Sequence, residues 1–141
     1  MATAMKKLLV YPVESTLLEI LDPDFESFMR HLNDLDGTQN NYIYLLIERA
    51  WIGIDTSGNG HFHLTYGGTS GGSKYGNGNL IDPSQNSREE VKYHFYDGHI
   101  EKVPKNQLVP AQLARQVAIQ FFETGTIPRG LHWEGDMEDY Q

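Results

Sequence analysis

Apolar residues early in the chain recur with the spacing of an amphipathic helix. The four that share this spacing are Phe25, Phe28, Met29 and Leu32. Positions i, i+3, i+4 and i+7 lie on one helix face, which indicates a buried stripe. Residues 22–24 read Asp-Pro-Asp and supply an N-cap, a proline for the first helical position and an acid for the first turn. We therefore predict a helix that starts there and ends near Gly37, with a strand over 17–21 before it.

The next segments have the patterns of strands. Residues 42–47 are apolar or aromatic at every position, which is typical of a central strand covered on both faces. Residues 51–54 and 61–66 flank a glycine-containing turn over 55–60 and predict a hairpin. Within the second arm, three apolar residues alternate with polar ones, so one face is buried: Phe62, Leu64 and Tyr66.

The second half predicts another hairpin and another helix. Residues 91–96 and 99–103 flank Asp97-Gly98, a strong turn signal. Pro110 suits the first turn of a helix whose apolar stripe continues to Gly125, a residue that ends helices well. The stripe consists of Leu113, Ala114, Val117, Ala118, Phe121 and Phe122. Residues 131–133 are long enough for a last edge strand.

Together these elements predict an α+β fold, an antiparallel sheet of about six strands with two helices packed mainly on one face. We expect a single domain over 1–133. Residues 67–79 are polar and rich in glycine, which favours a flexible surface loop or a functional flap. Residues 134–141 contain four acids and are expected to form a frayed acidic tail.

Composition narrows the class of function. The 141 residues include nineteen acidic and eleven basic ones, and the formal net charge is −8. This balance argues against direct nucleic-acid binding, which needs clustered Lys and Arg, and permits a basic protein partner. The chain has no cysteine, which excludes disulfides, Cys-ligated zinc and thiol nucleophiles. Pro12 and Glu14 interrupt the short apolar run after Lys6 and Lys7, so we expect neither a signal peptide nor a membrane span, and a cytoplasmic location.

Few residues have the spacing of a reactive site. His61 and His63 project from one strand face, and His94 or Asp55 is the nearest candidate to complete a metal site with them. The alternative is that both histidines are polar residues on the wetter face of that strand. The glycine-rich segment has no phosphate-loop motif, and no serine stands in a nucleophile context. We therefore expect neither an enzyme nor a cofactor.

Aromatic and acidic residues offer a different kind of site. The aromatics at predicted strand ends and loops are Trp51, Tyr66, Tyr75, Tyr96 and Trp133, and the tail acids are Glu134, Asp136, Glu138 and Asp139. Aromatic anchors with an acidic rim suit a basic protein surface. Ordinary core tryptophans and a solvated tail explain the same residues, and the composition does not decide between the two.

The second half also carries a family pattern. It consists of Gly98-His99-Ile100-Glu101-Lys102-Val103-Pro104, Leu108-Val109-Pro110, Ala114-Arg115, Ala118-Ile119, Phe121-Phe122-Glu123-Thr124-Gly125, Pro128 and Leu131-His132-Trp133. This pattern resembles the C-terminal signature of the first-named immunity-protein family of bacterial polymorphic toxin systems. The hairpin from Trp51 to Tyr66 also stands where that family has one, so the resemblance covers about residues 40–133.

The resemblance implies a function that the residues alone do not. Proteins of this family are encoded beside toxins, frequently nucleic-acid deaminases, and protect the producing cell by binding the toxin domain. The chain is then expected to be an antitoxin whose partner is the cognate toxin domain, with the motif residues as scaffold. The rival hypotheses are a metal-dependent or small-ligand-binding protein that uses His61, His63 and His94, and an adaptor without a toxin.

An antitoxin of this kind would cover the substrate cleft of its toxin with an exposed acidic and aromatic surface. Residues at predicted loops and strand ends have the appropriate charge or ring. The toxin-binding residues predicted on this basis are Asp55, Tyr75, Glu89, Glu90, Glu134 and Asp136.

Overall fold

The computed structural model describes residues 5–12, 17–36, 40–56, 60–68, 76–94 and 100–135. Within them the elements along the chain are β1 (Lys6–Pro12), β2 (Leu18–Leu21), α1 (Phe25–Asn33), β3 (Asn40–Ile47), β4 (Ala50–Thr56), β5 (His61–Gly68), β6 (Gly76–Leu80), β7 (Glu90–His94), β8 (Ile100–Pro104), the 3-10 helix η1 (Lys105–Gln107), β9 (Val109–Pro110), α2 (Ala111–Thr124) and β10 (Trp133–Gly135). The α+β class and the two helices predicted from the sequence are confirmed. The number of strands is larger than predicted.

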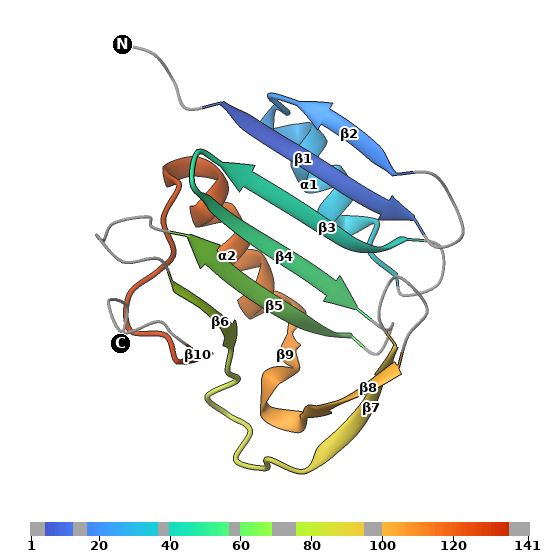
Figure 1. The fold of residues 1–141 in the computed structure, drawn as a ribbon, viewed down its shortest axis with the longest axis vertical. Coiled ribbons are helices and arrows are strands. Elements are labelled where there is room, and N and C mark those ends of the chain that lie inside the picture. The colour runs from blue at the N-terminus through green and yellow to red at the C-terminus, as the bar shows by residue number, and fades with distance from the viewer. Residues whose placement is uncertain are drawn as a thin grey trace.

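Eight of these strands form one antiparallel sheet, and α1 and α2 both cover the same face of it (Figure 1). The order is β10-β6-β5-β4-β3-β1-β2, and the short β9 pairs with β5 outside this path. Strands β7 and β8 form a separate two-stranded sheet. The segments predicted over 91–96 and 99–103 are therefore a hairpin of their own. They do not extend the main sheet.

The core lies between the main sheet and the two helices. Phe28 of α1 stacks on Phe122 of α2, with ring centroids 5.0 Å apart. Tyr66 of β5 meets Phe121 edge to face at 6.0 Å and contacts Trp133 of β10 at 6.0 Å. Tyr66 and Trp133 are at most 1% exposed. These two aromatics are therefore core residues, which agrees with the predicted buried face of residues 61–66 for Tyr66 and with the core interpretation for Trp133.

The start of α1 lies two residues later than the sequence predicts. Asp24 is the N-cap, and its Oδ1 accepts a hydrogen bond of 2.7 Å from the backbone N–H of Ser27. Asp22, the predicted cap, has a φ of 50° and ends β2 instead. The helix ends at Asn33 with Asp34 as C-cap, and Gly37 lies outside the described residues.

The end of α2 agrees with the prediction. Gly125 takes the left-handed conformation at φ 73°, and its N–H donates to the Phe121 carbonyl over 2.8 Å. Glycine adopts this conformation without the Cβ clash that other residues meet. Pro110 is the N-cap and stands just before the first helical residue, Ala111.

Three segments differ from their predicted structure. Strand β3 is not covered equally on both faces, because Ile43, Leu45 and Ile47 are buried while the residues between them are half-buried. The range 67–79, predicted as a loop, begins with the last residues of β5 and ends within β6. The rest of that range, 69–75, lies outside the described residues.

Strand β1 is absent from the sequence-based prediction, although it lies between β3 and β2 inside the sheet. The final strand was expected over 131–133 and is found at Trp133–Gly135, on the edge formed with β6. Neither α1 nor α2 has the length and the apolar run that crossing a membrane requires.

The cap of α1 gives a first test. We expect Asp24→Ala to lower the free energy of unfolding by about 1 kcal/mol, because the Ser27 N–H loses its acceptor. Asp24→Asn is the matched control and should stay close to the parent protein, since asparagine caps helices about as well as aspartate. Urea denaturation of the three proteins measures both changes. Equal loss in the two variants would contradict the assignment of this cap.

Candidate functional site

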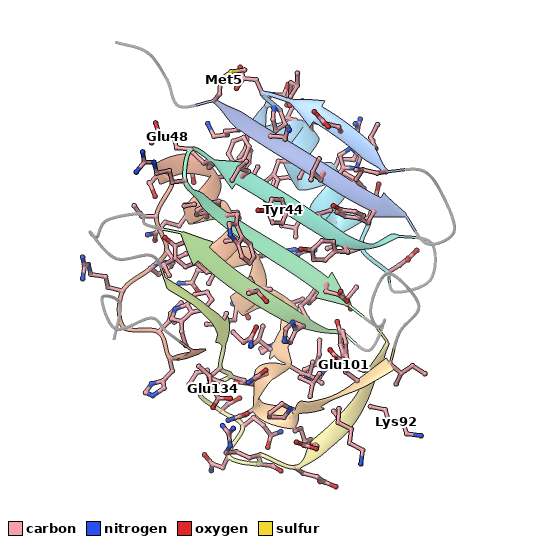
Figure 2. The ribbon with its side chains drawn as sticks, viewed as in Figure 1. Met5, Tyr44, Glu48, Lys92, Glu101 and Glu134 are labelled. Carbon is pink, nitrogen blue, oxygen red and sulfur yellow. The ribbon has the colours of Figure 1, made fainter. Side chains whose placement is uncertain are left out.

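The face of the main sheet away from the helices carries a group of half-buried apolar and aromatic side chains. Alternate residues of β1, β3 and β4 point there, because their neighbours Leu8, Leu45 and Ile52 belong to the core below. We call this group the aromatic face; it consists of Leu9, Tyr11, Tyr42, Tyr44, Leu46 and Trp51. Tyr44 lies near its centre (Figure 2).

The rings of the aromatic face are arranged in two pairs. Tyr11 and Tyr42 are opposite each other on β1 and β3, with ring centroids 5.1 Å apart. Tyr44 and Trp51 stack with centroids 5.2 Å apart and planes inclined by 22°. Aromatic pairs with these geometries attract each other beyond the area that they bury.

Two glycines allow the rings to lie close to the backbone of the sheet. A Cβ atom at Gly53 would stand 2.5 Å from the hydroxyl oxygen of Tyr42. A Cβ atom at Gly67 would stand 2.5 Å from ring atoms of Trp51. Each ring therefore occupies the space that a side chain on the neighbouring strand would fill.

One row of residues connects the aromatic face to the far edge of the sheet. Tyr44 is opposite Gly53, which is opposite Thr65, which is opposite Asn79, which is opposite Glu134. Residues directly opposite in antiparallel strands point to the same face. A 2.9 Å hydrogen bond from the Thr65 hydroxyl to Asn79 Oδ1 lies along this row. Glu134 is thus on the same side of the sheet as Tyr44.

Glu134 is held by a charged partner. Both oxygens accept hydrogen bonds from the Arg88 guanidinium, at 2.6 and 3.1 Å, and Gln107 Nε2 donates to Oε1 at 2.6 Å. The hydrogen bonds from Arg88 hold the pKa of the Glu134 carboxyl below its ordinary value. Arg88 directly precedes Glu89 and Glu90, whose side chains are exposed. We call Glu89, Glu90 and Glu134 the acidic end.

The remaining predicted toxin-binding residues have different positions. Asp55 was expected in an exposed turn but belongs to β4 and is 2% exposed, so that expected position is wrong. Its Oδ1 accepts a 2.9 Å hydrogen bond from the Tyr93 hydroxyl, which joins the main sheet to the small one. Burial is the main cause that raises the pKa of Tyr93 far above its ordinary value, and the nearby Asp55 charge adds to it. Tyr75 and Asp136 lie outside the described residues.

Two histidines of the metal hypothesis, His61 and His63, lie at the same end of β5 as this bond. His61 is exposed, whereas His63 is half-buried with its ring centroid 5.9 Å from that of Tyr93. Burial lowers the pKa of His63, which favours the neutral ring, while its hydrogen bond with Gln107 acts in the opposite direction. In the described part of the chain, no three His, Asp or Glu side chains are grouped to hold a metal ion. The side chain of His94 is not among the described ones.

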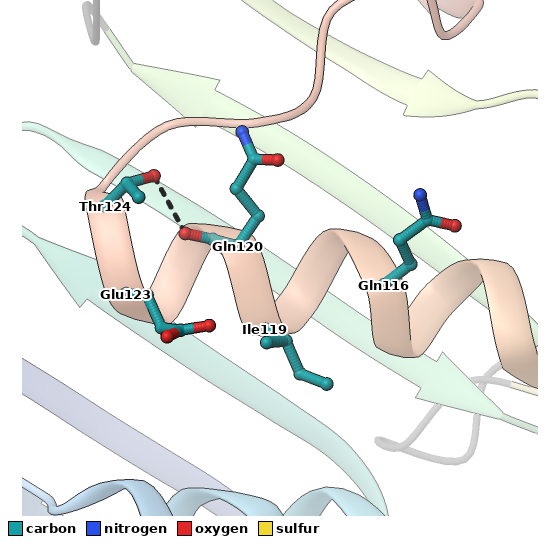
Figure 3. A pocket seen from close by; sticks show the side chains of 5 residues that line it. All are labelled: Gln116, Ile119, Gln120, Glu123 and Thr124. Atoms are coloured by element: carbon teal, nitrogen blue, oxygen red, sulfur yellow. Dashed lines mark hydrogen bonds between the residues drawn. The ribbon is translucent and has the colours of Figure 1, made fainter.

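A shallow hollow of about 380 Å³ lies on α2, on the helix side of the sheet (Figure 3). It is lined by Gln116, Ile119, Gln120, Glu123 and Thr124. The Thr124 hydroxyl donates to the Gln120 carbonyl over 2.8 Å, a bond internal to the helix. The lining holds one carboxylate and no basic side chain, and its one hydroxyl is bonded to the helix backbone, so these five residues do not form a nucleophile–base pair.

The Asp55–Tyr93 bond gives a stability prediction. We expect Tyr93→Phe to lower the free energy of unfolding by about 1.5–3 kcal/mol, because a buried carboxylate loses a donor. The loss should shrink when the same change is made in an Asp55→Asn background, since a neutral amide needs that donor less. Denaturation of the four proteins of this cycle measures the coupling. Full additivity would contradict the contribution of this hydrogen bond.

The lowered pKa of His63 gives a pH dependence with a definite sign. A pKa below the ordinary 6.5 means that the unfolded chain binds the proton more readily than the folded one. The stability from neutral His63 is therefore present above pH 6.5 and lost as pH falls through the folded-state pKa. We expect the free energy of unfolding to fall less steeply between about pH 7 and 5 in His63→Gln than in the parent protein. Identical slopes would contradict this assignment.

Comparison with known proteins adds one finding. The family model for Immunity protein Imm1 matches residues 24–135, from the cap of α1 to the end of β10. This range includes the region 40–133 in which the sequence resembles that family, and it extends to α1. No curated protein and no solved structure gives a significant match. The model covers most of the chain, and the chain therefore belongs to the Imm1 immunity protein family.

Proposed function

We propose that this protein is an antitoxin that binds a cognate toxin domain, a nucleic-acid deaminase, and blocks it by covering its substrate cleft. The family match is the observation that carries the antitoxin role. Inhibition is then stoichiometric, and the chain needs no catalytic group of its own. We propose the cytoplasm as the place of action, where a toxin directed at nucleic acid meets its substrate.

The aromatic face and the acidic end together form the proposed toxin-binding surface. Tyrosine and tryptophan are enriched among the residues that dominate binding energy at protein interfaces. The row from Tyr44 to Glu134 supports this choice, because Glu134 of the acidic end points to the same side of the sheet as Tyr44. Neither α1 nor α2 covers that side (Figure 1). In this proposal the rings supply apolar contact area, and the carboxylates of the acidic end supply charge at the far edge of the sheet.

Charge supports the choice of a nucleic-acid-directed toxin. A cleft that holds a polynucleotide needs Lys and Arg to neutralise phosphates. This chain has a net charge of −8. Two of its carboxylates, Glu89 and Glu90, are exposed and directly follow Arg88, which pairs with Glu134. Opposite potentials on two surfaces accelerate their association and favour the right partner. Of the six predicted contacts, the three at the acidic end fit this surface, whereas Asp55 points to the same face of the sheet but is buried and bonded to Tyr93.

The experiment is a co-expression rescue. The C-terminal domain encoded by the neighbouring upstream reading frame is induced in a heterologous bacterium with and without this chain. We expect growth arrest that the chain relieves, and a stoichiometric complex of the two purified proteins. Arrest that persists in the presence of folded chain would contradict that pairing.

Variants then locate the surface by their affinity for the toxin domain. We expect Trp51→Ala to weaken binding by about tenfold or more, because it removes a half-buried aromatic anchor. Glu90→Lys should mainly slow association, since an exposed charge at an interface rim acts on the rate of encounter. Glu123→Lys on the helix side makes the same change in charge and should leave the affinity unchanged. Equal effects of Glu90→Lys and Glu123→Lys would contradict the proposed surface.

A further inference from the structure

Exposed apolar side chains gather at one edge of the main sheet. Among the described residues, six large hydrophobic side chains are exposed, and Ile100 is the one on the small sheet. The other five come from the start of β1, from β2 and its approach, and from the start of α1: Met5, Leu17, Leu18, Leu21 and Phe25. Leu21 is 61% exposed and Met5 67%. Met5 lies at the β2 side of the sheet in Figure 2, and such a concentration marks an interaction surface.

The backbone of β2 has an unpaired side at the same place. Strand β2 is last in the strand order and pairs with β1 alone in the described part of the chain. The Asp22 N–H donates to the Lys6 carbonyl over 2.7 Å, which makes those two residues a hydrogen-bonded pair. Hydrogen-bonded and non-hydrogen-bonded pairs alternate along an antiparallel ladder. Ile20, opposite Leu8, therefore bonds to β1, and the backbone groups of Glu19 and Leu21 point outward.

We propose that β2 pairs with β2 of a second copy of this chain, antiparallel, about a twofold axis at Ile20. In this register, Glu19 of each copy is opposite Leu21 of the other. The two outward-pointing residues of each strand then exchange all of their backbone N–H and C=O groups, which makes four hydrogen bonds. The pairing extends the eight-stranded sheet across the axis and covers the apolar edge.

The alternative registers are less favourable for identifiable reasons. Shifting the axis to Glu19 places the two Glu19 carboxylates directly opposite each other, and like charges in that position are destabilising. Shifting it to Leu21 places Glu19 opposite Pro23, which has no N–H to donate. The axis at Ile20 avoids both problems, so the outward-pointing backbone groups of this edge are complementary to those of a second copy.

Side chains at the edge support the pairing on both faces of the ribbon. Leu21 and Glu19 point to the face away from the helices, and Leu18 and Ile20 point to the helix side. Charged side chains commonly protect sheet edges from pairing. Here the Glu19 carboxylate lies 3.5 Å from Lys7 Nζ of its own copy, and in the proposed register it is opposite Leu21, so no like charges are directly opposite each other. The positive φ of Asp22 ends the strand, which limits the interface and predicts a dimer that depends on concentration.

Sedimentation equilibrium from micromolar to millimolar protein tests the association. We expect a reversible dimer, and we expect Leu21→Lys to raise its dissociation constant at least tenfold. Ile100→Lys makes the same change at an exposed position of the small sheet and should leave the constant unchanged. Both variants are checked by circular dichroism and thermal unfolding. A parent protein that stays monomeric over this range, or equal effects of the two variants, would overturn the proposal.

Cysteine cross-linking tests the register. The chain has no cysteine, so a single introduced thiol reports on one position. At the proposed axis Ile20 faces Ile20 of the other copy as a non-hydrogen-bonded pair, with Cα atoms about 4.5 Å apart, within reach of a disulfide. We expect Ile20→Cys to oxidise to a covalent dimer and Leu18→Cys to stay monomeric, because Leu18 is opposite Asp22. Efficient cross-linking of Leu18→Cys alone would overturn this register, and weaker toxin binding by a monomeric Leu21→Lys would assign the edge to the toxin instead.

Discussion

The placement of both helices on one face of the main sheet determines the rest of the molecule. Covering that face buries Leu8, Leu45 and Ile52 against α1 and α2, which provides the core. Neither α1 nor α2, the two α-helices of the described residues, covers the opposite face (Figure 1). The aromatic side chains on that face limit their exposure by packing against the sheet and against each other. Tyr42 and Trp51 lie close to the backbone at Gly53 and Gly67, and Trp51 also stacks on Tyr44.

The small sheet closes one end of this uncovered face. Tyr93 and Val103 from β7 and β8 are buried although neither belongs to the main core. The bond between Tyr93 and Asp55 satisfies a carboxylate that would be costly to bury without a donor. The ring of His63 lies beside that of Tyr93, and His63 is hydrogen-bonded to Gln107. In such a network of polar side chains, the loss of one hydrogen bond affects the others.

The sequence predicts local structure well where short-range signals dominate. The apolar stripe of α2 and its Gly125 terminus agree with the structure because both depend on residues within a few positions of each other. The sequence does not predict β1, because its own apolar run is short. The strand is defined by its pairing with β2 and β3, which the local sequence does not reveal. The cap of α1 was assigned to Asp22 because Asp-Pro-Asp offers two aspartates, and the backbone turn at Asp22 decides between them.

The candidate site was predictable only in part, for the same reason. Exposure of Glu89 and Glu90 follows from their charge. The burial of Asp55 does not, because it depends on Tyr93, which is 38 residues away along the chain. The pairing of Tyr42 with Gly53 and of Trp51 with Gly67 was also hidden, because a glycine in a strand has no side chain to reveal its partner. A strand glycine directly opposite or diagonal to an aromatic residue is the signal that would have found these contacts.

The two proposed surfaces have a simple geometric relation. Antiparallel pairing of β2 with its copy is a rotation about an axis normal to the sheet, which keeps the helices of both copies on one side. The two aromatic faces then lie together on the other side, each separated from the axis by β2. The proposed pairing at the edge uses backbone groups of Glu19 and Leu21, whereas the proposed toxin-binding surface consists of side chains of β1, β3 and β4 and of the acidic end. A dimer formed in this way leaves both toxin-binding surfaces open, so self-association and inhibition are compatible in one assembly.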